Sequence, residues 1–279
     1  AGEQKLAVQV VYMANGDRAR VDEALNGLWY AGVRTAPVIL PLKDVYTETL
    51  RLALLNWDEQ EATRLLVEQI RRFQPEVIVT HDLNGEYGHG AHMATATCMV
   101  NAVPQAADAT AFPDSAALYG AWQTQKLYLH LYPENQITMN WNQPLDAFGG
   151  MTALEAANEA YQMHVSQLEY HSNVYGDGDY SSSLYGLAYS AVGQDEAKND
   201  FFEHVDPARL SNYVAPTPSP TPVATATPNI TPTPMHTAEM DKLMQTNNVS
   251  LFLIAGGSAF VAAFSAAVAV VVLRKKKNK

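Results

Sequence analysis

The stretch EVIVTHDLNGEYGHGAHMATATCMV, residues 76–100, indicates the fold most clearly. Its first five residues form a short apolar run with β-branched side chains, followed by a polar loop that contains Gly85, Gly88 and Gly90. A run of this kind bounded by glycines predicts a strand, and the small and apolar residues from Ala91 to Val103 predict a helix. A strand, a glycine-rich loop and a helix in succession are typical of an α/β protein.

Further strands and helices alternate along the first 213 residues. We expect strands at 7–13, 38–40 and 126–132, and helices at 21–31 and 57–73. This alternation predicts an α/β domain with a parallel sheet. Ligands of such sheets bind in the loops that follow the carboxyl ends of the strands. The loops after Ala14 and Thr80 are therefore the first places to search for a functional site.

The loop after Thr80 contains His81, His89 and His92, three of the eight histidines in the chain. His89 and His92 are three residues apart near the start of the predicted helix, so both rings can point to one place. Neutral imidazole is a common zinc ligand, and catalytic zinc sites usually combine three protein ligands with a water molecule. Because two histidines at this spacing are a weak signal, a polar surface loop with solvated histidines is the alternative.

The sequence around these histidines resembles a known family. The segment Gly85-Glu86-Tyr87-Gly88-His89-x-x-His92 is similar to the second motif of the LmbE-like/PIG-L family of zinc-dependent N-acetylglucosamine de-N-acetylases. Other segments resemble the same family in order and spacing: Val10–Gly16, Arg20-x-x-Glu23-Ala24 with Gly32-Val33, and Tyr161–Gln167.

The resemblance implies a Rossmann-like α/β fold, with a mostly parallel sheet flanked by helices. It also implies hydrolysis of the acetamide of an N-acetylated sugar or glycoconjugate, with a zinc ion that polarises a water molecule and an aspartate as general base. By resemblance, His92 is expected to be a zinc ligand, and His89 a catalytic residue that assists the tetrahedral intermediate or the leaving amine. Arg20 is expected to contact the substrate.

The first motif of the family, P-H-P-D-D-E, does not occur in these 279 residues. In the family it precedes the strand that begins here at Ala7, and it supplies two zinc ligands and the general base. We therefore expect the remaining ligands upstream of Ala1 and expect this chain by itself to be inactive. The alternative is a catalytically inactive relative that keeps the cleft as a glycan-binding module. A smaller departure is Ala91, which stands where the family commonly has the orienting aspartate of H-P-D-H.

Three other residues are candidates for supporting or structural roles. His130 lies in the alternating segment 126–132 and either lines the site or is an internally bonded strand residue. His164 matches the late helix of the family, where a structural or supporting role is expected. Cys98 is the only cysteine, which excludes an intrachain disulfide, and its place among apolar residues predicts a core position.

The charge distribution bears on partners. The formal net charge is −11, but residues 1–214 contain 12 basic and 27 acidic side chains. A domain this acidic is poorly suited to binding phosphate backbones, so nucleic acid is not an expected partner.

The C-terminal part of the chain predicts a membrane anchor. We divide the chain into a domain at 1–213, a Pro/Thr-rich stalk at 214–248, a transmembrane helix at 249–273 and a basic tail at 274–279. The 25 residues of the third segment carry no charge, which is long enough to span a bilayer. By the positive-inside rule the tail is cytoplasmic and the domain extracellular. The expected location is thus the cell membrane, with the C-terminal helix in the lipid.

Overall fold

The computed structural model describes residues 3, 6–14, 17–170, 172–198, 200–206 and, for the backbone, 271–275. The strands (β), α-helices (α) and 3-10 helices (η) of this part of the chain have the following bounds: β1 Leu6–Gln9, β2 Val11–Tyr12, α1 Arg18–Tyr30, β3 Val38–Ile39, α2 Leu50–Trp57, α3 Glu59–Phe73, β4 Val77–Thr80, η1 Glu86–Gly88, α4 Gly90–Ala107, α5 Pro113–Tyr119, β5 Lys126–His130, β6 Ile137–Thr138, η2 Asp146–Phe148, α6 Ala153–Tyr161, η3 Val165–Gln167, β7 Leu184–Ser190 and β8 Val271–Lys275.

Local capping sets the helix boundaries. Asp17 accepts a hydrogen bond of 2.9 Å from the backbone N–H of Arg20, which starts α1 before the predicted residue 21. The helix predicted at 57–73 is interrupted at Asp58, whose φ of 59° ends α2 and whose side chain caps α3. A capping box between Thr152 and Glu155 starts α6. The helix ends at Tyr161, so the segment expected as a late helix continues into the short turn η3.

The main sheet is mixed. Its strand order is β1-β8-β4-β5-β7-β6, and β2 and β3 form a separate parallel pair. Strands β4 and β5 are parallel, with Val77 opposite Lys126 and Thr80 opposite Leu129. The other pairs of the main sheet are antiparallel. The α/β class is confirmed, and the parallel pairs come from strands that the βα alternation predicts.

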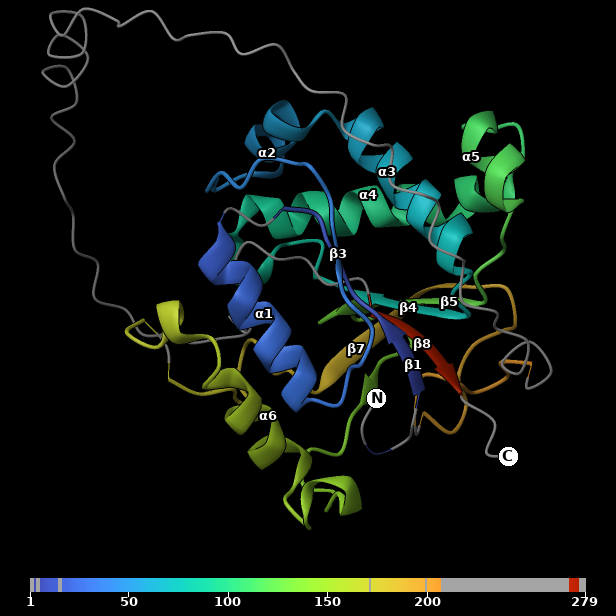
Figure 1. Ribbon diagram of the computed structural model, residues 1–279. Helices are drawn as coiled ribbons and strands as arrows, with labels where there is room; N and C mark the ends of the chain where they lie inside the picture. The colour runs from blue at the N-terminus through green and yellow to red at the C-terminus, as the bar shows by residue number, and fades with distance from the viewer. Residues whose placement is uncertain are drawn as a thin grey trace, which may run out of the picture. The chain divides into compact units, whose positions relative to one another are not determined.

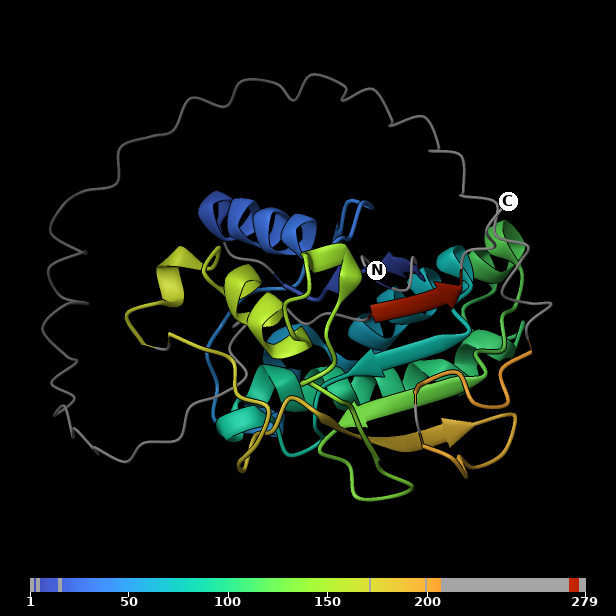
Figure 2. The same ribbon diagram turned by 90° about the horizontal axis from the view of Figure 1, so that it is seen from below.

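Helices cover both faces of the sheet. Helices α2, α3 and α4 lie on one side, whereas α1 and α6 lie together on the other (Figures 1 and 2). The period of two along each strand divides the apolar side chains between two cores. Ile78, Leu127 and Leu129 belong to the core beneath α3 and α4. Val77 and Tyr128 belong to the core on the α1 side.

Strand β8 corrects the predicted membrane anchor. It lies between β1 and β4, and Val272 is opposite Gln9 on one side and Ile78 on the other. The predicted transmembrane helix is therefore wrong at residues 271–273, which are strand, as are Arg274 and Lys275 of the predicted tail. An interior strand is also an uninterrupted apolar run, so its composition resembles that of a membrane segment.

The predicted location is corrected with it. Within the described ranges, no helix is both long and apolar enough to cross a membrane. The prediction of a cell-membrane protein held by a C-terminal helix in the lipid is contradicted by this finding. The predicted stalk at 214–248, and residues 249–270 and 276–279, lie outside the described residues.

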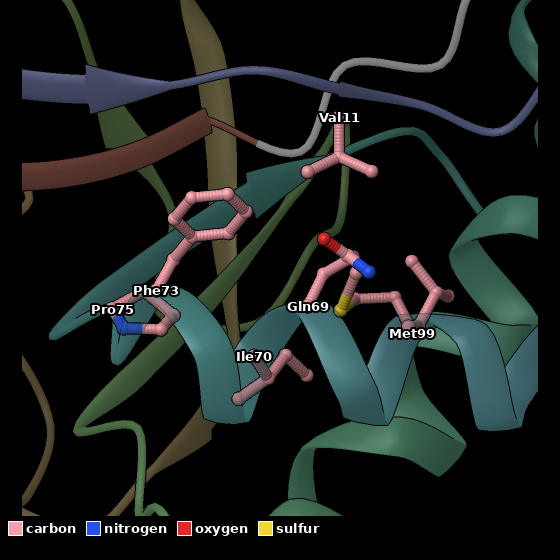
Figure 3. A pocket seen from close by; sticks show the side chains of 7 residues that line it. Val11, Gln69, Ile70, Phe73, Pro75 and Met99 are labelled. Atoms are coloured by element: carbon pink, nitrogen blue, oxygen red, sulfur yellow. The ribbon is translucent and has the colours of Figure 1, made fainter. Parts of the chain in front are cut away.

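Two cavities lie away from the predicted site. One, among α3, α4 and β2, is lined by Val11, Gln69, Phe73 and Met99 (Figure 3) and has a volume of about 10 Å³. This is about the space of one water molecule, so it is a packing void. The other is apolar and has a volume of about 430 Å³; Val79, Met139, Trp141, Tyr185 and Phe201 are among its lining residues.

Candidate histidine–carboxylate site

The site lies at the carboxyl ends of the two parallel strands of the main sheet. His81 follows β4, and the chain then turns through η1 into α4, which His89 precedes as its N-cap residue. His92 lies in the first turn of α4, and His130 is the last residue of β5. Because β4 and β5 are parallel and adjacent, segments far apart in sequence meet at this edge.

The buried carboxylate of Glu86 holds three of these histidines. Its Oε2 accepts hydrogen bonds from Nδ1 of His81 at 2.7 Å and Nδ1 of His92 at 2.8 Å. Its Oε1 accepts from Nδ1 of His130 at 2.8 Å and from the backbone N–H of Asp82 at 3.2 Å. A carboxylate has about four lone-pair sites. All of them are therefore used by donors of the protein.

These donors decide the charge of Glu86. Burial by itself would raise the pKa of this carboxyl group, but the charge of His81 and the hydrogen bonds from His130, His81 and His92 hold the pKa well below its ordinary value. Glu86 is therefore ionised at neutral pH, although its side chain is only 2% exposed.

The ring of His92 is buried in a column of imidazoles. It stacks on His81 with centroids 4.1 Å apart and on His89 with centroids 4.5 Å apart. Burial, with the charge of His81, lowers the pKa of His92 to about 4, so the ring is neutral near pH 7. Since Nδ1 carries the proton donated to Glu86, Nε2 carries a lone pair. This Nε2 is buried and has no hydrogen-bond partner among the described residues.

His89 has the opposite tautomer. Its Nδ1 accepts a hydrogen bond of 3.3 Å from the backbone N–H of Ala91, because His89 caps α4. Burial and the charge of His81 lower its pKa, so this ring is also neutral near pH 7. The proton of a neutral His89 is consequently on Nε2. The two motif histidines thus differ at Nε2, which carries a lone pair in His92 and a proton in His89.

His130 is bonded at both ring nitrogens. Nδ1 donates to Glu86, and Nε2 lies 2.9 Å from the carbonyl oxygen of Ser181. Each ring nitrogen of His130 therefore has a partner within the protein. These contacts match the expectation that His130 is an internally bonded strand residue. Glu86, which accepts hydrogen bonds from both rings, connects His130 to His92.

Tyr87 adds a strained residue to the site. It has a φ of 49° and lies between Gly85 and Gly88, whose φ values are 68° and 73°. Its ring packs edge-on against His92 with centroids 5.4 Å apart. Burial raises the pKa of Tyr87, and its buried hydroxyl has no hydrogen-bond partner in the described part of the chain. Strained residues of this kind are concentrated at functional sites.

Two glycines allow the loop to pack this closely. A Cβ on Gly85 would lie 2.6 Å from the carbonyl oxygen of His89, and one on Gly90 would lie 2.4 Å from Oγ1 of Thr47. Gly90 also donates a hydrogen bond of 2.7 Å to the carbonyl of Thr47. The turn into α4 therefore requires glycine at both positions.

Arg20 lies on α1 in a second polar cluster. Its Nη1 donates to Nε2 of His164 at 3.2 Å and to Oγ of Ser166 at 3.1 Å. Glu23 accepts from Nδ1 of His164 at 2.8 Å and from the backbone N–H of Ser166 at 2.7 Å. The ring of His164 is therefore hydrogen-bonded to Glu23 on one side and to Arg20 on the other. Such contacts fit the structural or supporting role expected for this residue.

The charge of Arg20 reaches two tyrosines, one of which belongs to the histidine site. The positive charge of Arg20 acts on Tyr87 and on Tyr161, where it opposes the increase in pKa that burial causes. Tyr161 also packs edge-on against His164, with centroids 6.0 Å apart. Tyr87 thus packs against His92 and also lies within the electrostatic influence of Arg20.

His81, Glu86 and His92 have the composition of a metal site. One ligand atom from each lies within 4.8 Å of the other two. Two arrangements are possible: Glu86 is itself a ligand, or Glu86 orients the rings and the metal binds the far side of His92. The unpartnered, buried Nε2 of His92 fits a metal ion in the second arrangement, because a neutral imidazole nitrogen is a common zinc ligand.

The sequence motif alone reveals part of this site. It correctly indicated that His89 and His92 lie together, whereas Arg20 belongs to a second cluster, in which it is hydrogen-bonded to His164 and Ser166. Glu86, Tyr87 and His130 were not proposed as contributors from the motif. The usable signal for His130 was its position at the end of a strand that the βα order places beside β4.

Fold and site together define an α/β protein with a buried histidine–carboxylate centre at the strand ends. Residues 1–103 match the model of the PIG-L family, described as GlcNAc-PI de-N-acetylase. The chain therefore carries a PIG-L (LmbE-like) domain at residues 1–103, as the motifs implied. This match includes Arg20, His89 and His92.

Several curated relatives align with part of this chain. The 1D-myo-inositol 2-acetamido-2-deoxy-alpha-D-glucopyranoside deacetylase of Geodermatophilus obscurus is 39% identical over 83 residues, which are 30% of this chain and 27% of the relative. Deacetylase 2 of that name from Saccharopolyspora erythraea is 29% identical over 136 residues, 46% of this chain and 48% of the relative. The mycothiol S-conjugate amidase of Streptomyces coelicolor is 42% identical over 72 residues, 25% of this chain and 24% of the relative.

The extent of these matches is limited. The chain spans about a quarter to a half of the length of these three relatives. Among solved structures, the conserved protein TT1542 from Thermus thermophilus superposes with a TM-score of 0.36 at 15% identity, over 66% of this chain and 83% of that chain.

Proposed function

We propose that this site belongs to a zinc-dependent hydrolase that removes acetyl groups from N-acetylglucosamine-type sugars. The observation that carries the proposal is the pair of complementary tautomers at His92 and His89. The buried lone pair on Nε2 of His92 suits a metal ligand, and the N–H on Nε2 of His89 suits a donor to developing negative charge or to a leaving amine.

The names of the relatives support the substrate class. Two of them are named as deacetylases of an N-acetylglucosamine-containing inositol glycoside. A bound zinc ion would supply a Lewis acid that polarises the amide carbonyl and lowers the pKa of a bound water molecule. The role of His92 is to hold the metal, and the role of His89 is to donate its Nε2 proton.

Two further residues are proposed to bind the sugar. The protonated hydroxyl of Tyr87 is a buried donor beside His92, and it can bind an oxygen of the ligand. Arg20, whose charge acts on Tyr87, is proposed to bind a hydroxyl group of the sugar through its guanidinium N–H donors. Both residues therefore act in binding and orientation.

Acetate release tests the proposal. No P-H-P-D-D-E string supplies a general base within residues 1–279, so we expect this chain alone to bind zinc weakly and to release no acetate. Preceded by a segment that carries the P-H-P-D-D-E motif, it should release acetate from the N-acetylated inositol glycoside when zinc is present. His92→Asn in the same fusion should abolish the release.

The second candidate is a glycan-binding module without catalysis, which the missing motif favours. It predicts that residues 1–279 bind N-acetylglucosamine, measured by ligand-observed NMR, and that a folded fusion releases no acetate with zinc. Acetate release by the fusion, lost in His92→Asn, would exclude the binding module. If a folded fusion neither binds N-acetylglucosamine nor releases acetate, both candidates are contradicted.

A further inference from the structure

We infer that Glu86 is a positioning residue: it holds His92 in the Nδ1–H tautomer, so that Nε2 of this ring is presented to a metal ion. The inference deepens the proposed function and rests on it only for the identity of the group that Nε2 binds. The orientation of the ring is a property of the metal-free protein.

The hydrogen bonds of Glu86 exclude it as a direct ligand in this arrangement. Four donors, three imidazoles and the N–H of Asp82, use the lone pairs of the carboxylate. The distances also argue against a zinc ion shared by these atoms, because Nδ1 of His81 and Nδ1 of His92 lie only 2.7 and 2.8 Å from Oε2. Ligands of one tetrahedral zinc ion at about 2.1 Å would be about 3.4 Å from one another.

The arrangement is that of a carboxylate behind a metal-binding histidine. Such a carboxylate accepts the second ring N–H, which fixes the tautomer and the orientation and makes the far nitrogen a better ligand. Glu86 contacts His81 and His130 as well, so it ties the end of β4, the end of β5 and the first turn of α4 to one point. A displacement of any of these elements would move His92.

Ala91 makes this contribution more important. The resembled pattern has an aspartate at the position of Ala91, and this chain has no carboxylate there. Among the described residues, Glu86 is the carboxylate that hydrogen-bonds His92. The orienting carboxylate is thus supplied from η1, six residues before the ring that it holds.

The first test uses the metal-free, full 279-residue chain labelled with ¹⁵N. A long-range ¹H–¹⁵N spectrum at pH 7 should show His92 protonated at Nδ1 and unprotonated at Nε2. Protonation at Nε2 would overturn the inference, whether or not the protein binds zinc or releases acetate.

The second test compares Glu86→Gln with the control Glu159→Gln, an exposed residue of α6. Glutamine has one acceptor oxygen, so Glu86→Gln should give His92 a mixture of tautomers and weaken zinc binding by about 10- to 100-fold. The control should match the wild type in both measurements. A folded Glu86→Gln protein with an unchanged His92 spectrum and unchanged zinc affinity would overturn the inference.

Glu86→Asp covers the case in which Glu86→Gln does not fold. The shorter carboxylate keeps its charge but cannot reach all three rings, so we expect an altered His92 spectrum and an intermediate zinc affinity. Wild-type behaviour of Glu86→Asp in both measurements would contradict the inference. If neither the 279-residue chain nor the fusion that carries the P-H-P-D-D-E segment binds zinc, the metal in the proposed function is refuted, while the tautomer measurement still decides the role of Glu86.

Discussion

Nδ1 of His92 lies 2.8 Å from Oε2 of Glu86, in a contact where both side chains are at most 2% exposed. The contact joins the two features of the site that determine its chemistry, a carboxylate bonded to three histidines and a ring with an unpartnered Nε2 in the described structure. Its consequences can be measured in stability, in ligand binding and in metal binding.

Replacing Gly85 by alanine should destabilise the protein more than a glycine substitution in open space. The φ of 68° costs a non-glycine residue about 1–2 kcal/mol, and the added Cβ would also meet the carbonyl oxygen of His89 at 2.6 Å. Gly193→Ala is the control, because its φ of 97° is also positive but nothing lies within 4 Å. Urea unfolding should show Gly85→Ala at least about 1 kcal/mol less stable than the control. An equal loss of unfolding free energy in the two variants would contradict a steric requirement for glycine at position 85.

Arg71 should be essential for stability although it is far from the histidines. Its fully buried guanidinium donates to the carbonyl oxygens of residues 105, 106, 108, 111 and 112 and to Oγ of Ser115. Arg71→Met leaves these acceptors without their donor and should cost at least about 3 kcal/mol in urea unfolding. Arg51→Lys, at an exposed position of α2, should change the free energy of unfolding by less than about 0.5 kcal/mol. A small loss for Arg71→Met would contradict the role of this residue as the link between α3 and the end of α4.

Stability should decrease as the pH falls from 6.5 toward about 4. The pKa of His92 is lowered from 6.5 to about 4 in the folded protein, so in this window the unfolded chain binds a proton that the folded protein does not. Stability therefore increases with pH across the window, by up to about 1.4 kcal/mol per pH unit from this group. Glu86 acts in the same direction below its ordinary pKa, because its pKa is lowered in the folded state. Urea unfolding at pH 7 and pH 5 measures the slope, which should be smaller in His92→Asn; an unchanged slope would contradict a neutral, buried His92.

Arg20→Met should weaken sugar binding without changing zinc binding. The substitution removes the hydrogen bonds to His164 and Ser166 and the donors proposed to contact the sugar, so we expect about a tenfold weaker affinity for N-acetylglucosamine by ligand-observed NMR. Arg18→Met on the same helix is the control, since the side chain of Arg18 is 95% exposed. Unchanged sugar affinity in Arg20→Met would remove this residue from the proposed binding site.

The sequence predicts the part of the fold in which local pattern and long-range packing agree. Strand β4, the loop after it and α4 follow from the apolar run, the glycines and the histidine spacing. The break between α2 and α3 at Asp58 is harder to predict from the sequence. The residues on both sides of Asp58 have a helical pattern, and the break comes from the positive φ of this one residue. The contacts of Glu86 with His130 require knowing that β4 and β5 are neighbours, which is a property of the sheet and not of either segment.

The C-terminal prediction fails for a physical reason that applies to other proteins. Val271, Val272 and Leu273 are apolar because they form an interior strand of the sheet, and a membrane helix has the same requirement. The β-branched valines of this run were the signal that favoured a strand. Length and lack of charge, by contrast, do not distinguish the two environments.

The central claim is that the metal binds His92 through Nε2, with Glu86 behind the ring. The most direct test is anomalous diffraction at the zinc edge from crystals of the 279-residue chain soaked with zinc. We expect a peak about 2.1 Å from Nε2 of His92, with Glu86 still hydrogen-bonded to Nδ1. A peak coordinated by Oε2 of Glu86 and the Nδ1 atoms of His81 and His92, or zinc bound only elsewhere, would contradict it.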